Sequence, residues 1–194
     1  MYQIEIANSQ DCLEVDEEFL IKAAERVLAE EEVAGAEISV ALVDNETIHR
    51  LNREYLNHDY ATDVLSFLLE CDQEIPDASP AEPPETHRGQ GKRLEGEVII
   101  STETARQDAK DFGWSPREEV VLYLIHGLLH LVGYDDLSST ERKVMRARER
   151  AMLAILEISP PDPSASNEGE NGSQSDEDPE RPASADSQNR RTES

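Results

Sequence analysis

Residues 126–136 decide the fold and the chemistry of this chain, and they read His-Gly-Leu-Leu-His-Leu-Val-Gly-Tyr-Asp-Asp. His126 and His130 are four residues apart, so a helix would bring both imidazoles onto one face, one turn from each other. Gly133 can end that helix in a left-handed conformation, after which the chain can turn back and offer Asp136 as a third ligand. Three protein ligands with a free fourth position are typical of a catalytic site with one Zn²⁺ per chain. The spacing therefore predicts a zincin-like metal helix with a metal-bound water as the reactive group.

The residue after the first histidine restricts the chemistry. The ligand order matches that of metzincin peptidases, which carry Glu directly after the first His as general base. Here that position is Gly127, so no protein general base can be assigned and an ordinary protease is disfavoured. The surrounding segment, residues 118–131, is strongly apolar, so a purely structural pair of histidines beside a core is the alternative. The glycine and the carboxylate at the expected offsets favour the metal site.

The stretch from His126 to Asp135 resembles the signature of the YbeY family of single-strand-specific, zinc-dependent endoribonucleases. Two other blocks, residues 62–67 and 96–101, resemble the family in the same order, and the resemblance covers about residues 1–158. It implies a metallo-endoribonuclease that acts in ribosomal RNA processing, in small-subunit maturation and in ribosome quality control. It also implies single-stranded ribosomal RNA and ribosome-associated proteins as partners.

Two positions depart from the family pattern. The third family ligand is His where this chain has Asp136, and a carboxylate should make zinc a weaker Lewis acid because it adds negative charge. The family carries Arg where this chain has Leu56, so a guanidinium that could hold a phosphate is missing. His58 is a candidate for a partial replacement. These departures keep one alternative open, a ribosome-associated metal-binding protein with weak or lost cleavage. The ligand spacing shared with metzincins keeps a second open, a metzincin-like hydrolase of another substrate.

Further polar residues are candidates for the cleft or for contacts behind the ligands. The resemblance implies that Asp63 and Ser66 lie near the metal, and Asp63 could accept a hydrogen bond from a metal-bound histidine. Asp135 is expected either to orient a ligand or to stabilise the turn after Gly133.

The charge of the chain is unusual for a protein that would bind RNA. The formal net charge is −25, and the tail from residue 159 contains nine acidic and three basic residues, so the remaining body carries −19. Such a body should bind phosphates poorly unless basic residues cluster. One cluster of basic residues follows the metal motif and consists of Arg142, Lys143, Arg146, Arg148 and Arg150. It is either a surface that faces RNA or a solvated helix face, and we favour the second interpretation.

Cysteine usage and hydropathy indicate a cytoplasmic protein. Cys12 and Cys71 are far apart and form no CxxC motif, so a disulfide framework is not expected. There is no signal-like N-terminus and no apolar run of about 18 residues, which argues against secretion and against a membrane partner.

The periodicity predicts an α+β fold, a small mixed β-sheet packed with helices. Alternating residues predict strands, and capping residues followed by apolar stripes predict helices. The expected strands are 2–7, 38–42, 64–69 and 94–101, and the expected helices are 16–31, 44–55, 101–113, 115–131 and 138–158. These elements form one domain, residues 1–158. Residues 70–93 are expected to be a flexible acidic, Pro-rich insertion, and residues 159–194 a disordered acidic tail.

Overall fold

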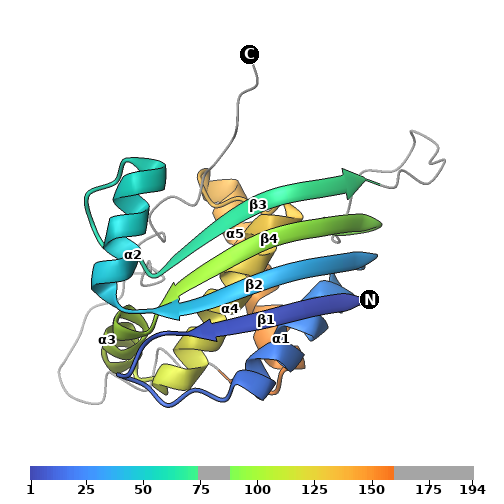
Figure 1. The fold of residues 1–194 in the computed structure, drawn as a ribbon. Coiled ribbons are helices and arrows are strands. Elements are labelled where there is room, and N and C mark those ends of the chain that lie inside the picture. Colours follow the sequence, from blue (N-terminus) through green and yellow to red (C-terminus); the bar gives the residue numbers. More distant parts are fainter. Residues whose placement is uncertain (74–87, 160–194) are drawn as a thin grey trace.

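The computed structural model describes residues 1–73 and 88–159, which form one mixed sheet and a set of helices (Figure 1). The element order is β1 (Tyr2–Asn8), α1 (Glu17–Glu30), β2 (Gly35–Val43), α2 (Asn45–Leu51), the π-helical turn η1 (Asn52–Leu56), β3 (Val64–Gln73), β4 (Lys92–Ser101), α3 (Thr102–Phe112), α4 (Pro116–Val132) and α5 (Ser139–Ile155). The prediction of an α+β fold is confirmed.

The sheet is mixed in direction. Its strand order is β1-β2-β4-β3, with β1 parallel to β2, β2 parallel to β4, and β3 antiparallel to β4. Helix α4 packs against β3 and β4 and also contacts α1, α3 and α5. Figure 1 shows α1, α4 and α5 on the same side of the sheet, where α1 contacts β1 and α4 contacts β3 and β4.

The sequence of α4 explains why it occupies this central place. It is apolar on nearly all sides, and a helix of that kind is stable only when it is surrounded by protein. Its start is fixed by a capping box at Ser115, whose hydroxyl accepts a hydrogen bond from the Arg117 amide while the Glu118 carboxylate accepts one from the Ser115 amide. Its end is fixed by Gly133, which has a φ of +109°. Both ends were predicted from these residues.

A second, smaller core lies on the other side of the sheet. Ile48 of α2 packs with residues of β2, β3 and β4 in this cluster, and Leu56 at the end of η1 packs against it. The predicted helix 44–55 is split in two, because the α-helical pattern ends at Leu51 and a π-helical turn follows. Asn57 ends that turn in the left-handed conformation, with a φ of +63°.

The predicted limits of the flexible insertion, 70–93, were wrong at both ends. Residues 70–73 continue β3 and residues 92–93 begin β4, with Asp72 opposite Arg93 and Gln73 opposite Lys92. Opposite charges on facing strands stabilise pairing even where intrinsic strand propensity is low. Residues 88–91 form a turn before β4, whereas residues 74–87 and nearly all of the predicted tail, residues 160–194, lie outside the described residues. Within the described part of the chain, no helix is long and apolar enough to span a membrane.

Candidate metal centre

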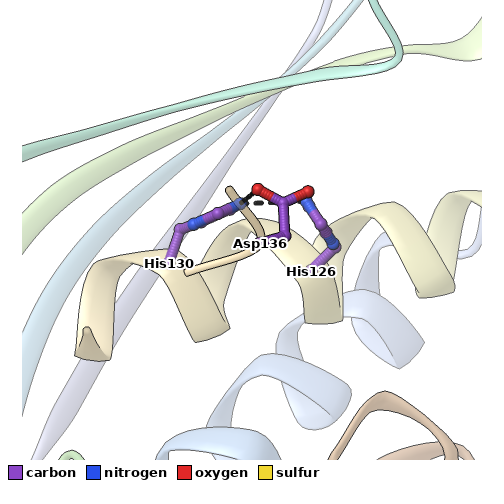
Figure 2. Close-up of side chains that lie close together, drawn as sticks. All are labelled: His126, His130 and Asp136. Atoms are coloured by element: carbon purple, nitrogen blue, oxygen red, sulfur yellow. Dashed lines mark hydrogen bonds and ion pairs between the residues drawn. The ribbon is translucent and has the colours of Figure 1, made fainter. Parts of the chain in front are cut away.

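Helix α4 and the turn after it bring the three predicted ligands together. His126 and His130 lie one turn apart on α4, with ring centroids 4.6 Å apart and ring planes at 81°. Asp136 reaches over them from the turn that follows Gly133 (Figure 2). One ligand atom from each of the three residues lies within 4.8 Å of the other two. The Nε2 atoms of the two histidines are 3.0 Å apart, and Oδ1 of Asp136 is 4.0 Å from Nε2 of His130.

The turn that carries Asp136 is held by its neighbours. Oδ1 of Asp135 accepts hydrogen bonds from the amides of Asp136, at 2.7 Å, and Leu137, at 3.2 Å. Such a side-chain-to-backbone turn fixes the direction in which the chain reverses. Nε of Arg142 donates to the carbonyl oxygen of Asp136 at 3.2 Å. Of the two roles expected for Asp135, the geometry favours stabilising the turn.

The second nitrogen of each histidine faces a hydrogen-bond acceptor. Nδ1 of His126 lies 2.7 Å from Oε1 of Glu149, and Nδ1 of His130 lies 3.1 Å from the carbonyl oxygen of Tyr134. These acceptors favour a proton on each Nδ1, which leaves the lone pairs on the two Nε2 atoms. Two lone pairs that face each other at 3.0 Å repel unless a proton or a metal cation lies between them. The donor set therefore fits a metal ion at the Nε2 side.

Burial and neighbouring charge act differently on the three side chains. His126 is 9% exposed and Asp136 7% exposed. Burial lowers the pKa of His126, but the hydrogen bond and the negative charge of Glu149 outweigh it, so the net shift is upward. Burial and the neighbouring His126 lower the pKa of His130 to about 4. Burial raises the pKa of Asp136. His130 is therefore neutral at physiological pH, which is the form that binds metal.

Asp63 lies close enough to His126 to act on it by its charge. It raises the pKa of His126 and stands at the head of β3, where Oδ1 accepts from the Thr62 hydroxyl and the Val64 amide, each at 2.9 Å. The acceptor for Nδ1 of His126 is Glu149 and not Asp63. The role predicted for Asp63, as the acceptor behind a ligand, therefore belongs to another residue.

Ser66 and His58 lie in different places relative to the ligands. Ser66 is 8% exposed, and its hydroxyl lies 3.3 Å from the position where Gly127 would carry a β-carbon. It thus sits between β3 and α4, next to the metal helix, and does not line open surface. His58 lies in the loop after η1, where its ring stacks on Tyr60 with centroids 5.5 Å apart. Within the described residues, His58 is outside the group that could hold a metal.

Comparison with known proteins agrees with this geometry. The family model described as Endoribonuclease YbeY matches residues 5–157. This chain belongs to the YbeY family. An Endoribonuclease YbeY of Rhodopirellula baltica is 40% identical over 152 residues, which cover 77% of this chain and 69% of the relative. One of Carboxydothermus hydrogenoformans is 39% identical over 155 residues, covering 78% and 96%. The solution structure of TM1509 from Thermotoga maritima aligns at 21% identity with a TM-score of 0.47, covering 83% of this chain and 98% of that one. The resemblance inferred from the motifs is confirmed.

One residue of this YbeY site was missed in the sequence. Glu149 of α5 lies within the basic cluster and is not among the residues that the sequence predicts for the site. It stands four residues after Met145 and three before Met152, and both methionines are buried. An acidic residue on the apolar face of an amphipathic helix is a signal for a buried partner, and this signal was available in the sequence.

The basic cluster of α5 is not a uniform surface in this YbeY protein. Arg142 binds the backbone of Asp136, and Arg148 forms an ion pair with Glu31, whose exposed fraction is 0%. Lys143 and Arg150 are exposed. Neither of the two expected explanations fits the whole cluster, because two of its arginines hold the structure around the metal turn together.

Proposed function

We propose that this YbeY-family chain is a zinc-dependent endoribonuclease that cleaves single-stranded ribosomal RNA in small-subunit maturation and ribosome quality control. His126, His130 and Asp136 hold one ion per chain, and residues 1–158 form the endoribonuclease domain. The cytoplasm is its proposed compartment and ribosome-associated proteins are proposed partners. The convergence of three donor atoms within 4.8 Å of one another carries the proposal.

The donor set favours zinc over the hard divalent cations. Two imidazole nitrogens and one carboxylate oxygen form a mixed set of the kind found in catalytic zinc sites with three protein ligands. Magnesium and calcium prefer sites made of oxygen alone. Both histidines have their Nδ1 atoms engaged, so each can offer only Nε2.

The residues around the ligands limit what the protein itself contributes. A bound ion supplies Lewis acidity toward a phosphodiester and a water of lowered pKa. Gly127 offers no side chain beside the first ligand. Glu149 contacts Nδ1 of His126, the ring nitrogen on the side away from His130, so it is not directed toward the ion. The chain therefore holds and orients the ligands, and no side chain is assigned as general base.

The deciding experiment is cleavage of a labelled single-stranded RNA by metal-analysed protein. The wild type is compared with His130→Ala and with His49→Ala, an exposed histidine that pairs with Asp59 and serves as the control. We expect about one zinc per chain and cleavage in the wild type and in His49→Ala, and loss of both in His130→Ala. Equal cleavage by wild type and His130→Ala would mean that the activity comes from a contaminant.

A second candidate is a ribosome-associated metal-binding protein with weak or lost cleavage. Two observations favour it: the carboxylate ligand Asp136 in place of the family's third histidine, and Leu56 in place of its arginine. Zinc bound at one per chain, with no cleavage by the wild type of any single-stranded RNA tested, would move this candidate ahead.

A further inference from the structure

Two adjacent residues of α5 reach the two histidines by separate routes. The first route is direct. Oε1 of Glu149 lies 2.7 Å from Nδ1 of His126, and the side chains of the pair are only 15% and 11% exposed. Glu149 is carried on the buried face of α5, beside Met145 and Met152, so its position is fixed by helix packing.

The second route runs from Arg148 to His130 through two residues, Glu31 and Tyr134. Arg148 binds the carboxylate of Glu31 and donates from Nη2 to the carbonyl oxygen of Glu30 at 2.9 Å. The hydroxyl of Tyr134 donates to the same Glu31 carboxylate, at 3.3 Å from either oxygen. The backbone carbonyl of Tyr134 is in turn the acceptor 3.1 Å from Nδ1 of His130. The ring of Tyr134 is also covered by the guanidinium of Arg88, 4.7 Å from its centroid.

We propose that α5 is the support for the metal ligands, with Glu149 as the positioning residue of His126 and Arg148 acting on His130 through Glu31 and Tyr134. The inference rests on the proposed metal site. A histidine that binds metal through Nε2 needs an acceptor at Nδ1, which fixes its tautomer, its ring orientation and its basicity. Helix α5 contacts the acceptor of His126 directly and reaches that of His130 through Glu31 and the Tyr134 side chain, so movement of α5 would disturb both ligands together.

A purely structural role is the competing explanation for Glu149. In that case its carboxylate would only join α5 to α4, and its loss would weaken folding without a selective effect on metal binding. The two explanations predict different results for zinc affinity and for the tautomer of His126. A purely structural contact would change neither of them.

The test compares four variants with the wild type, three at acidic residues and Tyr134→Phe. Glu149→Leu removes the acceptor and places an apolar side chain of similar size on the buried face. Glu149→Gln keeps a carbonyl oxygen that can accept from Nδ1 but removes the charge. Glu18→Gln is the control, because it removes an equal charge from an exposed helix pair with Lys22. Zinc affinity is measured by competition with a chromophoric chelator, and folding of the zinc-free protein by circular dichroism.

We expect Glu149→Leu to bind zinc about 10- to 100-fold more weakly than the wild type. Glu149→Gln should lose less, and Glu18→Gln should not change. Tyr134→Phe, which removes the hydroxyl that contacts Glu31 but keeps the backbone acceptor, should fall between Glu149→Gln and the control. Wild-type zinc affinity in a folded Glu149→Leu protein would overturn the proposal.

A second measurement needs no variant. Long-range ¹H–¹⁵N correlation spectra of the zinc-free wild type report which ring nitrogen of His126 is protonated. A proton on Nδ1 supports the proposal, and the Nε2–H tautomer overturns it, even if Glu149→Leu fails to fold. Failure of the wild type to bind zinc would contradict the proposed function, whereas zinc binding unchanged across the variants would contradict only the support by α5.

Discussion

The β-carbon that Gly127 lacks would lie 2.6 Å from Cγ1 of Val98, well inside the contact distance of two carbons. Helix α4 therefore crosses β4 at a separation that a side chain at this position would not permit. Gly96 of β4 is a similar case, since its missing β-carbon would be 2.9 Å from Cδ1 of Leu131. The space that a side chain at position 127 would occupy is thus filled by residues of the sheet, so the Glu that a metzincin peptidase needs after its first ligand has no room. We expect no cleavage of generic peptide substrates.

Gly127→Ala should destabilise the protein although alanine is the better helix former. Alanine gains about 1 kcal/mol of helix propensity over glycine, but overpacking a filled core costs about 1–3 kcal/mol. Because Val98 is stiff and buried, we expect a net loss of about 1 kcal/mol in the free energy of unfolding, measured with urea.

The contact with Val98 can be separated from other effects by a double-mutant cycle. Val98→Ala removes the methyl groups that collide with the new β-carbon, so the loss in the double variant should be smaller than the sum of the two single losses. Additive losses would contradict the packing argument.

Asp136→His should restore the family's third ligand and speed cleavage at neutral pH. An imidazole brings no negative charge, so the ion becomes a stronger Lewis acid and the pKa of its water falls. At a pH below the pKa of a zinc-bound water, each unit by which that pKa fell would raise the deprotonated fraction by up to about tenfold. The measurement is the pH–rate profile of RNA cleavage, with zinc content checked in each protein. An unchanged or slower rate at full zinc loading would count against this account of Asp136.

The metal helix could be predicted from the sequence because its signals are local. The cap at Ser115, the glycine at position 133 and the two histidines lie within one helix and its two ends. Local hydrogen bonds and helical spacing set their arrangement, so no knowledge of the sheet was needed.

The contacts behind the ligands could not be assigned from the sequence, because an acidic residue on an apolar helix face such as Glu149 indicates a partner but tertiary packing decides which one. Glu149 follows His126 by 23 residues, and Glu31 and Arg148 are 117 residues apart. The insertion of β4 between β2 and β3 also depends on tertiary packing. The end of β3 was missed for a different reason, since Glu70 and Asp72 have low strand propensity, and the pairing of Asp72 with Arg93 across the ladder cannot be seen in the sequence of β3 alone.

Leu56→Arg should strengthen RNA binding and weaken the fold slightly. Leu56 packs against the smaller core and is only partly buried. The loss in the free energy of unfolding should therefore be smaller than the value of about 1.5–3 kcal/mol for a fully buried leucine. One added phosphate contact should steepen the dependence of log affinity on log salt by about 0.7 for single-stranded RNA. The measurement is RNA affinity at several salt concentrations.

The control for this variant is Leu69→Arg. Leu69 is 59% exposed on β3, so the substitution adds the same charge at another place. An equal gain of RNA affinity in both variants would mean that net charge, and not the position of Leu56, is responsible.

Arg148→Met should destabilise the protein strongly because it leaves the Glu31 carboxylate buried without its cation. Removing one partner of a buried ion pair typically costs about 3–5 kcal/mol. Guanidinium-induced unfolding measures the loss, and Glu31→Gln combined with Arg148→Met should recover part of it. Arg26→Met is the matched control, since Arg26 pairs with Glu30 at a surface where its side chain is 56% exposed, and such pairs contribute about 0.5 kcal/mol. Similar losses in the two single variants would contradict the argument.

The N-cap of α2 gives a prediction about pH. Oδ1 of Asp44 accepts from the Thr47 amide at 2.7 Å, and its hydrogen bonds with Thr47 lower the pKa of Asp44. A lowered pKa in the folded state means that the unfolded chain takes up the proton first, so the stabilisation is complete above the ordinary value of 3.8 and is lost as the pH falls through the folded-state pKa. Asp44→Ala should therefore cost about 1 kcal/mol at pH 7, and the difference from wild type should shrink below about pH 4. Asp44→Asn keeps a capping oxygen without a titrating group, so its stability relative to Asp44→Ala should not depend on pH. Thermal unfolding between pH 3 and 7 checks both variants, and a wild-type advantage over Asp44→Ala that is as large at pH 3 as at pH 7 would show that the carboxylate form is not what caps α2.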